Sequence, residues 1–275
     1  MPVINHDDAS KNLYITEFNR CVMVPIVRQD KDAQNPAEGE LFSTTVIRSQ
    51  SLAGFEVCIN ACWYDLTFAG KVDAASGDDP VNASETLNQG IALTADNQRY
   101  GTSSPQMFYA AQDKNLSWKF GMGDVPNDMR TGVGGLCPLI INGLKYGTGN
   151  KYSRTGLKGA TLTGAPLPEH ARYLIQRNNN KYAALETAAN NDPGIGKVGF
   201  GVTADGKCYV VVQAHRRPGM SFNDFRNIFV NYGCVNAVAG DGSDSVFFYR
   251  DGQFHVRSNH NKEETMTIGI GFKLR

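Results

Sequence analysis

One carboxylate stands where it could take part in catalysis. Asp241 follows an apolar stretch, residues 234–239, and is itself followed by Gly242. Small neighbours let a substrate approach the backbone closely, so a carboxylate here could stabilise developing positive charge or activate water. The competing interpretation is an ordinary turn aspartate that hydrogen-bonds to its own backbone. The residues alone leave both interpretations open.

The polar turn continues through Ser243, Asp244 and Ser245. Asp244 is a candidate second carboxylate or metal ligand, because Asp241 and Asp244 form an Asp-x-x-Asp pair in a loop. The rest of a calcium-loop pattern is absent, so a divalent cation is one alternative and no cofactor is required. The two serines either bind an anion or satisfy the amides of the turn.

A basic cluster, His215-Arg216-Arg217, lies between an apolar stretch that ends at Gln213 and a helical pattern that begins after Ser221. Arginine binds phosphate through a bidentate fork, and a helix amino terminus pointing inward would add free amides. His215 is a candidate general acid or base. The competing interpretation is a solvated, charged loop.

Asn60 and Asp65 flank the aromatic pair Trp63-Tyr64. Asn60 lies in an apolar run, where an unpaired amide costs about 1–3 kcal/mol, so it must find partners. Those partners are either a neighbouring strand or a substrate. Asp65, at the end of the run, is the better placed of the two to face a site.

The elements that must position these residues are mostly strands. Asp-Gly turns inside two apolar runs predict hairpins over residues 198–212 and 246–256. The run Thr265–Leu274 alternates apolar and other residues, which predicts an antiparallel strand with one buried face. Ser221 caps a predicted helix that ends at Gly233.

Two weaker helical patterns cover residues 169–177 and 181–189, and the polar stretch 70–105 is predicted to be a loop or an insertion. The fold class expected is α+β, a mainly antiparallel sheet with hairpins and a few packed helices. We expect a single domain over residues 1–275.

Composition excludes several classes of protein. Lys plus Arg and Asp plus Glu number 27 each, and a nucleic-acid binder usually shows a basic excess. No run approaches the roughly 18 apolar residues of a membrane helix, and no signal peptide is visible. A cytoplasmic protein is expected, with leaderless export or a phage origin as alternatives. The six cysteines have no CxxC pair, which favours buried, reduced thiols.

Four segments resemble the phosphodiester glycosidase family. Residues 234–246 follow a helix, as the family's Asn-Leu-Asp-Gly-Gly-Gly-Ser strand does. Residues 58–65 are similar to its Ala-Ile-Asn-Gly-Gly-Phe-Phe-Asp strand, and residues 133–143 to its Gly-Gly-Gly-Pro-Leu-Leu turn. Residues 195–201 stand where the family has Pro-Arg-Thr-Ala-Ile-Gly. The four segments occur in the family's order.

The resemblance implies a hydrolase that cleaves a glycosyl–phosphate bond in a sugar-1-phosphodiester or a nucleotide-sugar-like substrate. With this reaction, the expected catalytic residues are Asp241 and Asp65, which lie in the similar segments, and His215, which is a candidate by its residue type. The expected substrate-binding residues are polar or charged, apart from one glycine: Asn60, Gly135, Lys197, Arg216, Arg217, Ser243, Asp244 and Ser245. Lys197 stands in place of the family's arginine, and Gly242-Ser243-Asp244 in place of its triple glycine.

Two other functions stay open. These replacements would also suit a sequestering protein that binds a sugar phosphate or nucleotide without turnover. The hairpin-rich composition and neutral charge would suit a structural component of a phage or secretion apparatus. The partner expected under the leading hypothesis is an anionic small molecule, not nucleic acid or a membrane, and the sequence indicates no oligomeric state.

Overall fold

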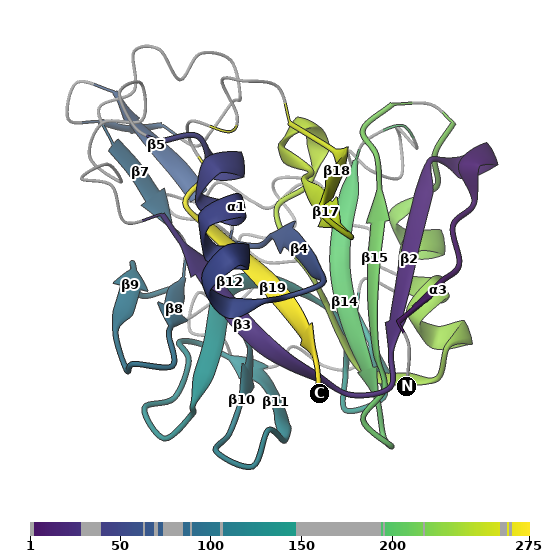
Figure 1. Ribbon diagram of the computed structural model, residues 1–275, viewed down its shortest axis with the longest axis horizontal. Coiled ribbons are helices and arrows are strands. Elements are labelled where there is room, and N and C mark those ends of the chain that lie inside the picture. Colours follow the sequence, from purple (N-terminus) through teal and green to yellow (C-terminus); the bar gives the residue numbers. More distant parts are fainter. Residues whose placement is uncertain are drawn as a thin grey trace, which may run out of the picture.

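The protein is seen here in a computed structural model (Figure 1). The structure describes residues 3–28, 40–62, 64–68, 71–73, 85–88, 90–104, 107–146, 194, 196–216, 218–258, 263 and 266–275. Every strand pairing among them is antiparallel. The α+β class with a mainly antiparallel sheet is therefore confirmed. No helix in this part of the chain is long and apolar enough to cross a membrane.

The largest sheet, sheet A, has eleven strands. Its main path runs β1 (Ile4–Asn5), β2 (Leu13–Phe18), β15 (Cys208–Gln213), β14 (Lys197–Thr203), β16 (Cys234–Ala239), β12 (Thr131–Ile141), β10 (Phe108–Gln112), β11 (Trp118–Met122). Three short strands extend it. β13 (Leu144–Lys145) and β8 (Ile91–Leu93) pair with β12, and β9 (Arg99–Gly101) pairs with β8.

The remaining described strands form two smaller sheets. Sheet B has the order β18 (Gln253–Val256), β17 (Phe248–Arg250), β4 (Val57–Asn60), β19 (Ile268–Leu274), β3 (Cys21–Val27). Sheet C has the order β6 (Lys71–Asp73), β5 (Tyr64–Phe68), β7 (Glu85–Asn88). The described helices are α1 (Phe42–Ala53), α3 (Phe222–Asn231) and the 3-10 turns η1 (Ala9–Lys11) and η7 (Ser243–Ser245).

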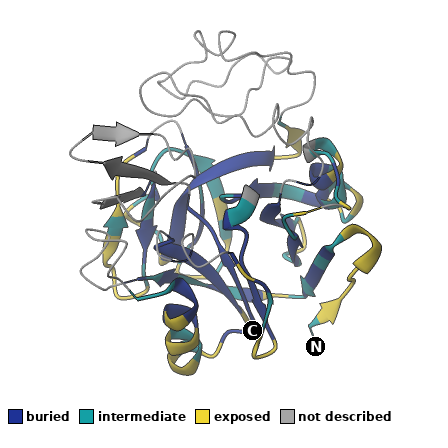
Figure 2. Cartoon of the chain, turned by 90° about the horizontal axis from the view of Figure 1, so that it is seen from above, coloured by how far each residue is buried: buried dark blue, intermediate teal, exposed yellow. Residues whose placement is uncertain are grey.

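Sheets A and B face each other across the main hydrophobic core. The rings of Phe200 in β14 and Phe272 in β19 meet edge to face, with centroids 5.1 Å apart. Helix α1 lies over the outer face of sheet B, and α3 packs on β14 and β16 (Figure 1). Buried residues concentrate on the strands, and exposed ones on turns and the outward sides of helices (Figure 2).

Glycines on the outer sides of two strands make room for the helices. In β14, a Cβ on Gly201 would lie 2.8 Å from the Phe229 ring of α3. In β19, a Cβ on Gly269 would lie 2.5 Å from Cζ of Phe42 in α1. Strand β19 is therefore covered on both faces from residue 268 to 272. The predicted strand is confirmed, but the expectation of only one buried face was wrong, because glycine admits an aromatic ring where a side chain would point outward.

Local turn and cap chemistry agrees with the predictions. In the hairpin β17–β18, Asp251 and Gly252 take φ angles of 52° and 81°, as a tight two-residue turn requires. The amide of Asp224 donates to the Ser221 hydroxyl at 3.1 Å, which caps α3. Gly233 ends that helix with a φ of 73°.

The stretch 70–105, expected as a loop or insertion, instead carries β6, β7, β8 and β9. These strands have only three or four residues each, too short for an alternating pattern to be visible. The helices expected at 169–177 and 181–189 lie outside the described residues.

The six cysteines are free and buried, as predicted. Burial raises the pKa of Cys234 to about 12, so this thiol stays protonated at neutral pH. A buried, protonated thiol is a weak nucleophile. These cysteines therefore serve as small core side chains.

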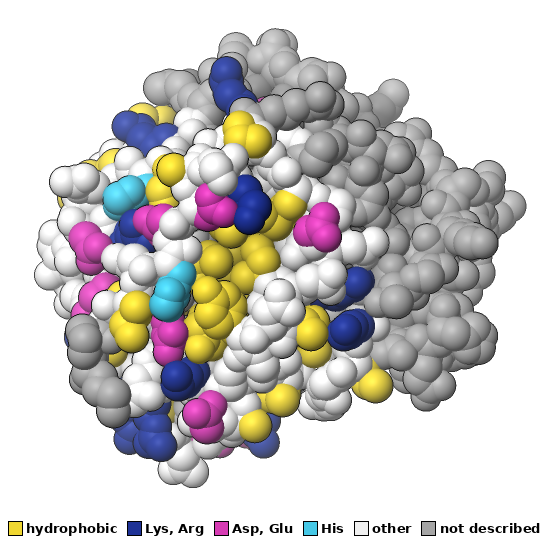
Figure 3. Space-filling view, turned by 90° about the vertical axis from the view of Figure 1, so that its right-hand side faces the viewer, with side chains coloured by type: hydrophobic (Ala, Val, Ile, Leu, Met, Phe, Trp, Pro, Cys, Tyr) yellow, Lys and Arg dark blue, Asp and Glu magenta, His cyan; other side chains and the backbone are white. Residues whose placement is uncertain are grey.

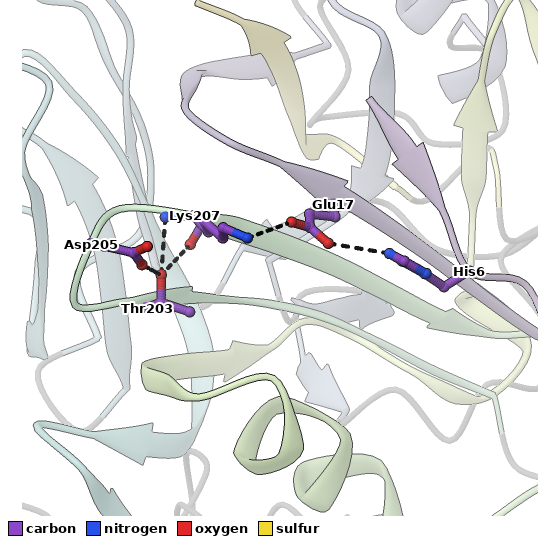
Figure 4. A network of polar contacts seen from close by, with 5 residues as sticks. All are labelled: His6, Glu17, Thr203, Asp205 and Lys207. Atoms are coloured by element: carbon purple, nitrogen blue, oxygen red, sulfur yellow. Dashed lines mark hydrogen bonds and ion pairs between the residues drawn. The ribbon is translucent and has the colours of Figure 1, made fainter. Parts of the chain in front are cut away.

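The outer edge of sheet A is held by a polar network (Figure 4). Glu17 accepts from Lys207 Nζ at 3.0 Å, and its second oxygen lies 3.2 Å from His6 Nε2. Burial alone would raise the pKa of Glu17, but these two partners outweigh it and hold the pKa below its ordinary value of 4.5. The face at this edge shows hydrophobic side chains among interspersed charges of both signs (Figure 3).

Replacing Gly269 with alanine should destabilise the fold by about 1–3 kcal/mol, because the new Cβ would overlap the Phe42 ring. Equilibrium unfolding in denaturant measures the loss. The exposed Leu52 serves as a control, since Leu52→Ala should change the free energy of unfolding by about 0.5 kcal/mol or less. A Gly269→Ala protein as stable as the wild type would contradict the packing of β19 against α1.

The Glu17 network should stabilise the protein at neutral pH and lose its effect in acid. A carboxyl whose pKa is lowered by folding contributes stability above its unfolded pKa, and this is lost as the pH falls through the folded value. Wild type should therefore exceed Glu17→Gln in thermal midpoint at pH 7, with the gap closing below about pH 4.5. A gap that is independent of pH would show that the charge on Glu17 is not responsible.

Candidate functional site

The ends of three neighbouring strands of sheet A meet at one place. Lys197 opens β14 and pairs with Gln213, the last residue of β15. Gly199, two residues further along β14, pairs with Ala239, the last residue of β16. His215 and Asp241 each follow two residues after their strands. The antiparallel register therefore brings Lys197, His215, Arg216 and the turn of residues 240–245, called the Asp241 turn, to the same end of the sheet.

Asp241 joins the two large sheets through its backbone. Its N–H donates to the carbonyl of Ala61, just past β4, at 2.9 Å. Its carbonyl accepts from Nδ2 of Asn60 at 2.8 Å. The preceding residue, Gly240, donates to the Val198 carbonyl of β14 at 3.0 Å. The half-buried Asp241 is thus fixed between a strand of sheet B and a strand of sheet A.

Two glycines allow this close approach. A Cβ on Gly240 would lie 2.7 Å from the Ala61 carbonyl oxygen, and one on Gly242 would lie 2.7 Å from the Gly196 carbonyl oxygen. Both contacts are with backbone atoms. The turn therefore passes between residues 60–61 on one side and residues 196–197 on the other, which places Asp241 beside the start of β14.

The basic cluster is tied to the same backbone. Gly196 N–H donates to Nδ1 of His215 at 3.2 Å, and Arg216 N–H donates to the Gly194 carbonyl at 2.9 Å. Because Nδ1 accepts, the proton of a neutral His215 ring lies on Nε2. Arg216 is exposed and takes a φ of 148°, which is costly for a residue with a side chain. Arg217 lies outside the described residues.

Lys197 is buried, with only 2% of its surface exposed. Its Cα lies 4.0 Å from where a Cβ on Gly242 would stand, so the two backbones run side by side. A lysine this deep is expected to keep its charge only with partners at hand, and Lys197 does have interactions. The structure thus sets the backbone of a buried lysine next to the Asp241 turn.

Asn60 is 1% exposed. Of its two predicted roles, bonding within the protein and contact with a substrate, the structure shows the first. Besides its bond to Asp241, its Oδ1 accepts from the N–H of Phe247 at 2.9 Å. Both ends of its amide are therefore engaged with protein backbone. The prediction that Asn60 contacts the substrate stays a prediction.

Residues 243–245 form the 3-10 turn η7, directly after Gly242. Ser245 is buried, and its N–H donates to the Gly242 carbonyl at 3.2 Å. Asp244 is half-buried, while the side chain of Ser243 is not among those described. Within the described part of the chain, no group of three or more His, Cys, Asp or Glu side chains could hold a metal ion.

Gly135 and Asp65 lie on other elements. Gly135 takes a φ of 68° in β12, where the pairing with β10 shifts register, and a Cβ on Gly90 would lie 2.0 Å from its nitrogen. Since Cys137 pairs with Ala239, the register of β12 and β16 sets Gly135 opposite Asp241. Asp65 lies in β5 of sheet C, and its side chain is not described.

Two backbone groups in this arrangement were not predicted from the sequence: the carbonyl of Ala61, which fixes Asp241, and the amide of Gly196, which orients His215. The only sequence signal for either is the glycine before Lys197. Side-chain types carry no information about which main-chain groups will meet.

Comparison with known proteins supports the resemblance. Residues 170–273 match the family model described as phosphodiester glycosidase, and this stretch contains Lys197, the basic cluster and the Asp241 turn. No curated protein sequence matches the chain.

Two solved structures are similar in fold. The catalytic domain of zebrafish N-acetylglucosamine-1-phosphodiester alpha-N-acetylglucosaminidase, auto-inhibited by pro-peptide, has a TM-score of 0.55 and 14% identity, over 100% of this chain and 82% of that one. A putative exported protein from Burkholderia pseudomallei has a TM-score of 0.50 and 10% identity, over 95% of this chain and 73% of that one. At these identities the likeness concerns the fold. The chain thus resembles the phosphodiester glycosidase family in sequence over residues 170–273, and it shares the fold of such a catalytic domain along its whole length.

Proposed function

We propose that the protein is a hydrolase that cleaves the glycosyl–phosphate bond of a sugar-1-phosphodiester or a nucleotide-sugar-like molecule. The observation that carries the proposal is the placement of the Asp241 turn beside the buried Lys197 and the His215–Arg216 backbone. A carboxylate and several cations at one sheet end suit a substrate that has an electron-poor anomeric carbon next to a phosphate. The family match over the same residues supports this assignment.

The chemistry follows from the leaving group. Water adds to the anomeric carbon, and the bond from that carbon to the phosphate oxygen breaks. The products are a free sugar and a phosphate monoester, or a free sugar and a nucleoside diphosphate where the substrate is a nucleotide sugar. A phosphate leaves without the strong general acid that ordinary glycoside hydrolysis needs. What the site must supply is a carboxylate for the oxocarbenium-like transition state or for the water, and donors for the phosphate.

Each candidate residue then has a role. Asp241 is the carboxylate beside the anomeric carbon, and Asp65 is the candidate second carboxylate. Lys197 and Arg216, with Arg217, bind the phosphate. His215 presents its protonated Nε2, which can donate a hydrogen bond or its proton to the leaving phosphate. Sugar-1-phosphodiesters are anionic small molecules, and they would be the partner of this site.

A binding protein without turnover is the second candidate. The observation that favours it is the departure from the family's triple glycine after Asp241, where Ser243 and Asp244 now form the turn η7. Turnover distinguishes the two functions. A sequestering protein would bind a sugar phosphodiester tightly and release no phosphate monoester.

Replacing Asp241 with asparagine should lower kcat by about 10²–10⁴-fold while substrate binding is largely kept, because the shape is retained and the charge is lost. The measurement is the release of phosphate monoester and reducing sugar from a panel of sugar-1-phosphodiesters and nucleotide sugars, with and without chelator. The matched control is Asp251→Asn, in the turn after β17 at the opposite end of β4 from Asn60. Full activity in Asp241→Asn would overturn the assignment.

Replacing the buried Lys197 with methionine should raise KM for the phosphodiester about 10- to 100-fold, since a charge-assisted hydrogen bond contributes about 1.5–3 kcal/mol. Steady-state kinetics on the substrate that the panel identifies gives this value. Lys119→Met, at an exposed position on β11, is the control for loss of a positive charge. Equal KM values for Lys197→Met and wild type would remove Lys197 from the phosphate site.

A further inference from the structure

Asn60 occupies an unusual position for an amide. It is the last residue of β4, pairs with Gly269 of β19 and is 1% exposed. A side-chain amide removed from water to this extent must be matched by partners. Its partners lie in neither neighbouring strand of sheet B. They belong to the segment that connects sheet A to β17.

The two bonds of Asn60 hold the two ends of that segment. Nδ2 donates to the Asp241 carbonyl at 2.8 Å, and Oδ1 accepts from the Phe247 amide at 2.9 Å. Rotating the amide by half a turn would set oxygen against oxygen and N–H against N–H, so a single orientation fits. Residues 241–247, which include the turn η7, are therefore closed into a loop across one side chain.

Few other residues could take this place. Aspartate would keep the acceptor for Phe247 and lose the donor to Asp241. Glutamine is longer by one methylene, and the Asn60 amide already meets the Asp241 carbonyl and the Phe247 N–H at 2.8 and 2.9 Å, so the amide of glutamine would not stand at the same place. Alanine would lose both bonds. The amide, its length and its burial are all required to hold the loop in this form.

We propose that Asn60 is a positioning residue that fixes the Asp241 carboxylate by holding the backbone of residues 241–247, and that it does not touch the substrate. The proposal rests on the proposed function of Asp241 for its effect on catalysis. A displacement of about 1 Å at a catalytic group can lower the rate about 100-fold. Loss of Asn60 should therefore affect the chemical step more than substrate binding.

The chain provides a matched control in Gln112. This residue is fully buried in β10, donates from Nε2 to the Cys21 carbonyl at 2.9 Å and accepts from the Met23 amide at 2.8 Å. It therefore bridges two backbone groups of β3 as Asn60 bridges two groups of the loop. Its contacts are with β3 and Leu116, not with residues 241–247. Equivalent substitutions at both positions separate general stability from positioning.

The test compares Asn60→Asp with Gln112→Glu, and Asn60→Ala with Gln112→Ala. Both Asn60 variants should lose about 100-fold in kcat with KM nearly unchanged. Both Gln112 variants should keep kcat while their denaturation midpoints fall. In hydrogen exchange, the Phe247 amide should exchange about tenfold faster in Asn60→Ala than in wild type. The Met23 amide should likewise exchange faster in Gln112→Ala.

The outcomes are separable. If wild type turns over a substrate and the Asn60 variants keep the kcat of the Gln112 variants, the positioning role is overturned. If wild type turns over nothing on the panel, the proposed function fails by itself. Amide exchange then tests separately whether Asn60 holds residues 241–247. Faster exchange confined to residues 241–247 in Asn60→Ala supports the conclusion that Asn60 holds the backbone of these residues. Unchanged exchange at Phe247 overturns that conclusion.

Discussion

The site depends on one close contact between two sheets. Strand β4 of sheet B and strand β16 of sheet A end side by side, and the Asp241 amide bonds to the Ala61 carbonyl across the junction. The backbones come so near that only glycine fits at positions 240 and 242. A buried asparagine secures the junction from the sheet B side. Because rigid strands hold its neighbours on both sides, Asp241 is placed by the scaffold and not by a free loop.

The junction keeps its geometry because the layers around it are packed on both faces. Strands β14 and β19 alternate large inward residues with glycines, and the glycines receive aromatic rings from the α3 and α1 sides. The two sheets meet inside through aromatic contacts such as Phe200 with Phe272. Well-packed interiors deform little, so the distance between β4 and β16 is determined by the core. The same packing brings the buried Lys197 beside the Asp241 turn.

Turn, cap and alternation signals predicted the hairpins, α3 and β19, because these depend on residues close together in the sequence. Helix α1 was not predicted: it is rich in serine and threonine, and its amino-terminal Leu41 makes no side-chain cap bond. The strands within 70–105 are too short to show a pattern. Asp241, Lys197 and His215 were proposed from residue type and resemblance, and the register of sheet A brings them to one end. The bonds of Asn60 and the Gly196–His215 contact depend on tertiary approach, which sequence periodicity does not encode.

We propose that a phosphodiester binds across the sheet end with its anomeric carbon at Asp241 and its phosphate toward Lys197 and Arg216. The most direct test is a crystal structure of the Asp241→Asn protein with an intact sugar-1-phosphodiester. We predict that the anomeric carbon contacts residue 241 and that the phosphate oxygens are within hydrogen-bond distance of Lys197 or Arg216. A ligand bound with its phosphate away from both Lys197 and Arg216, or at another place on the protein, would contradict this binding mode.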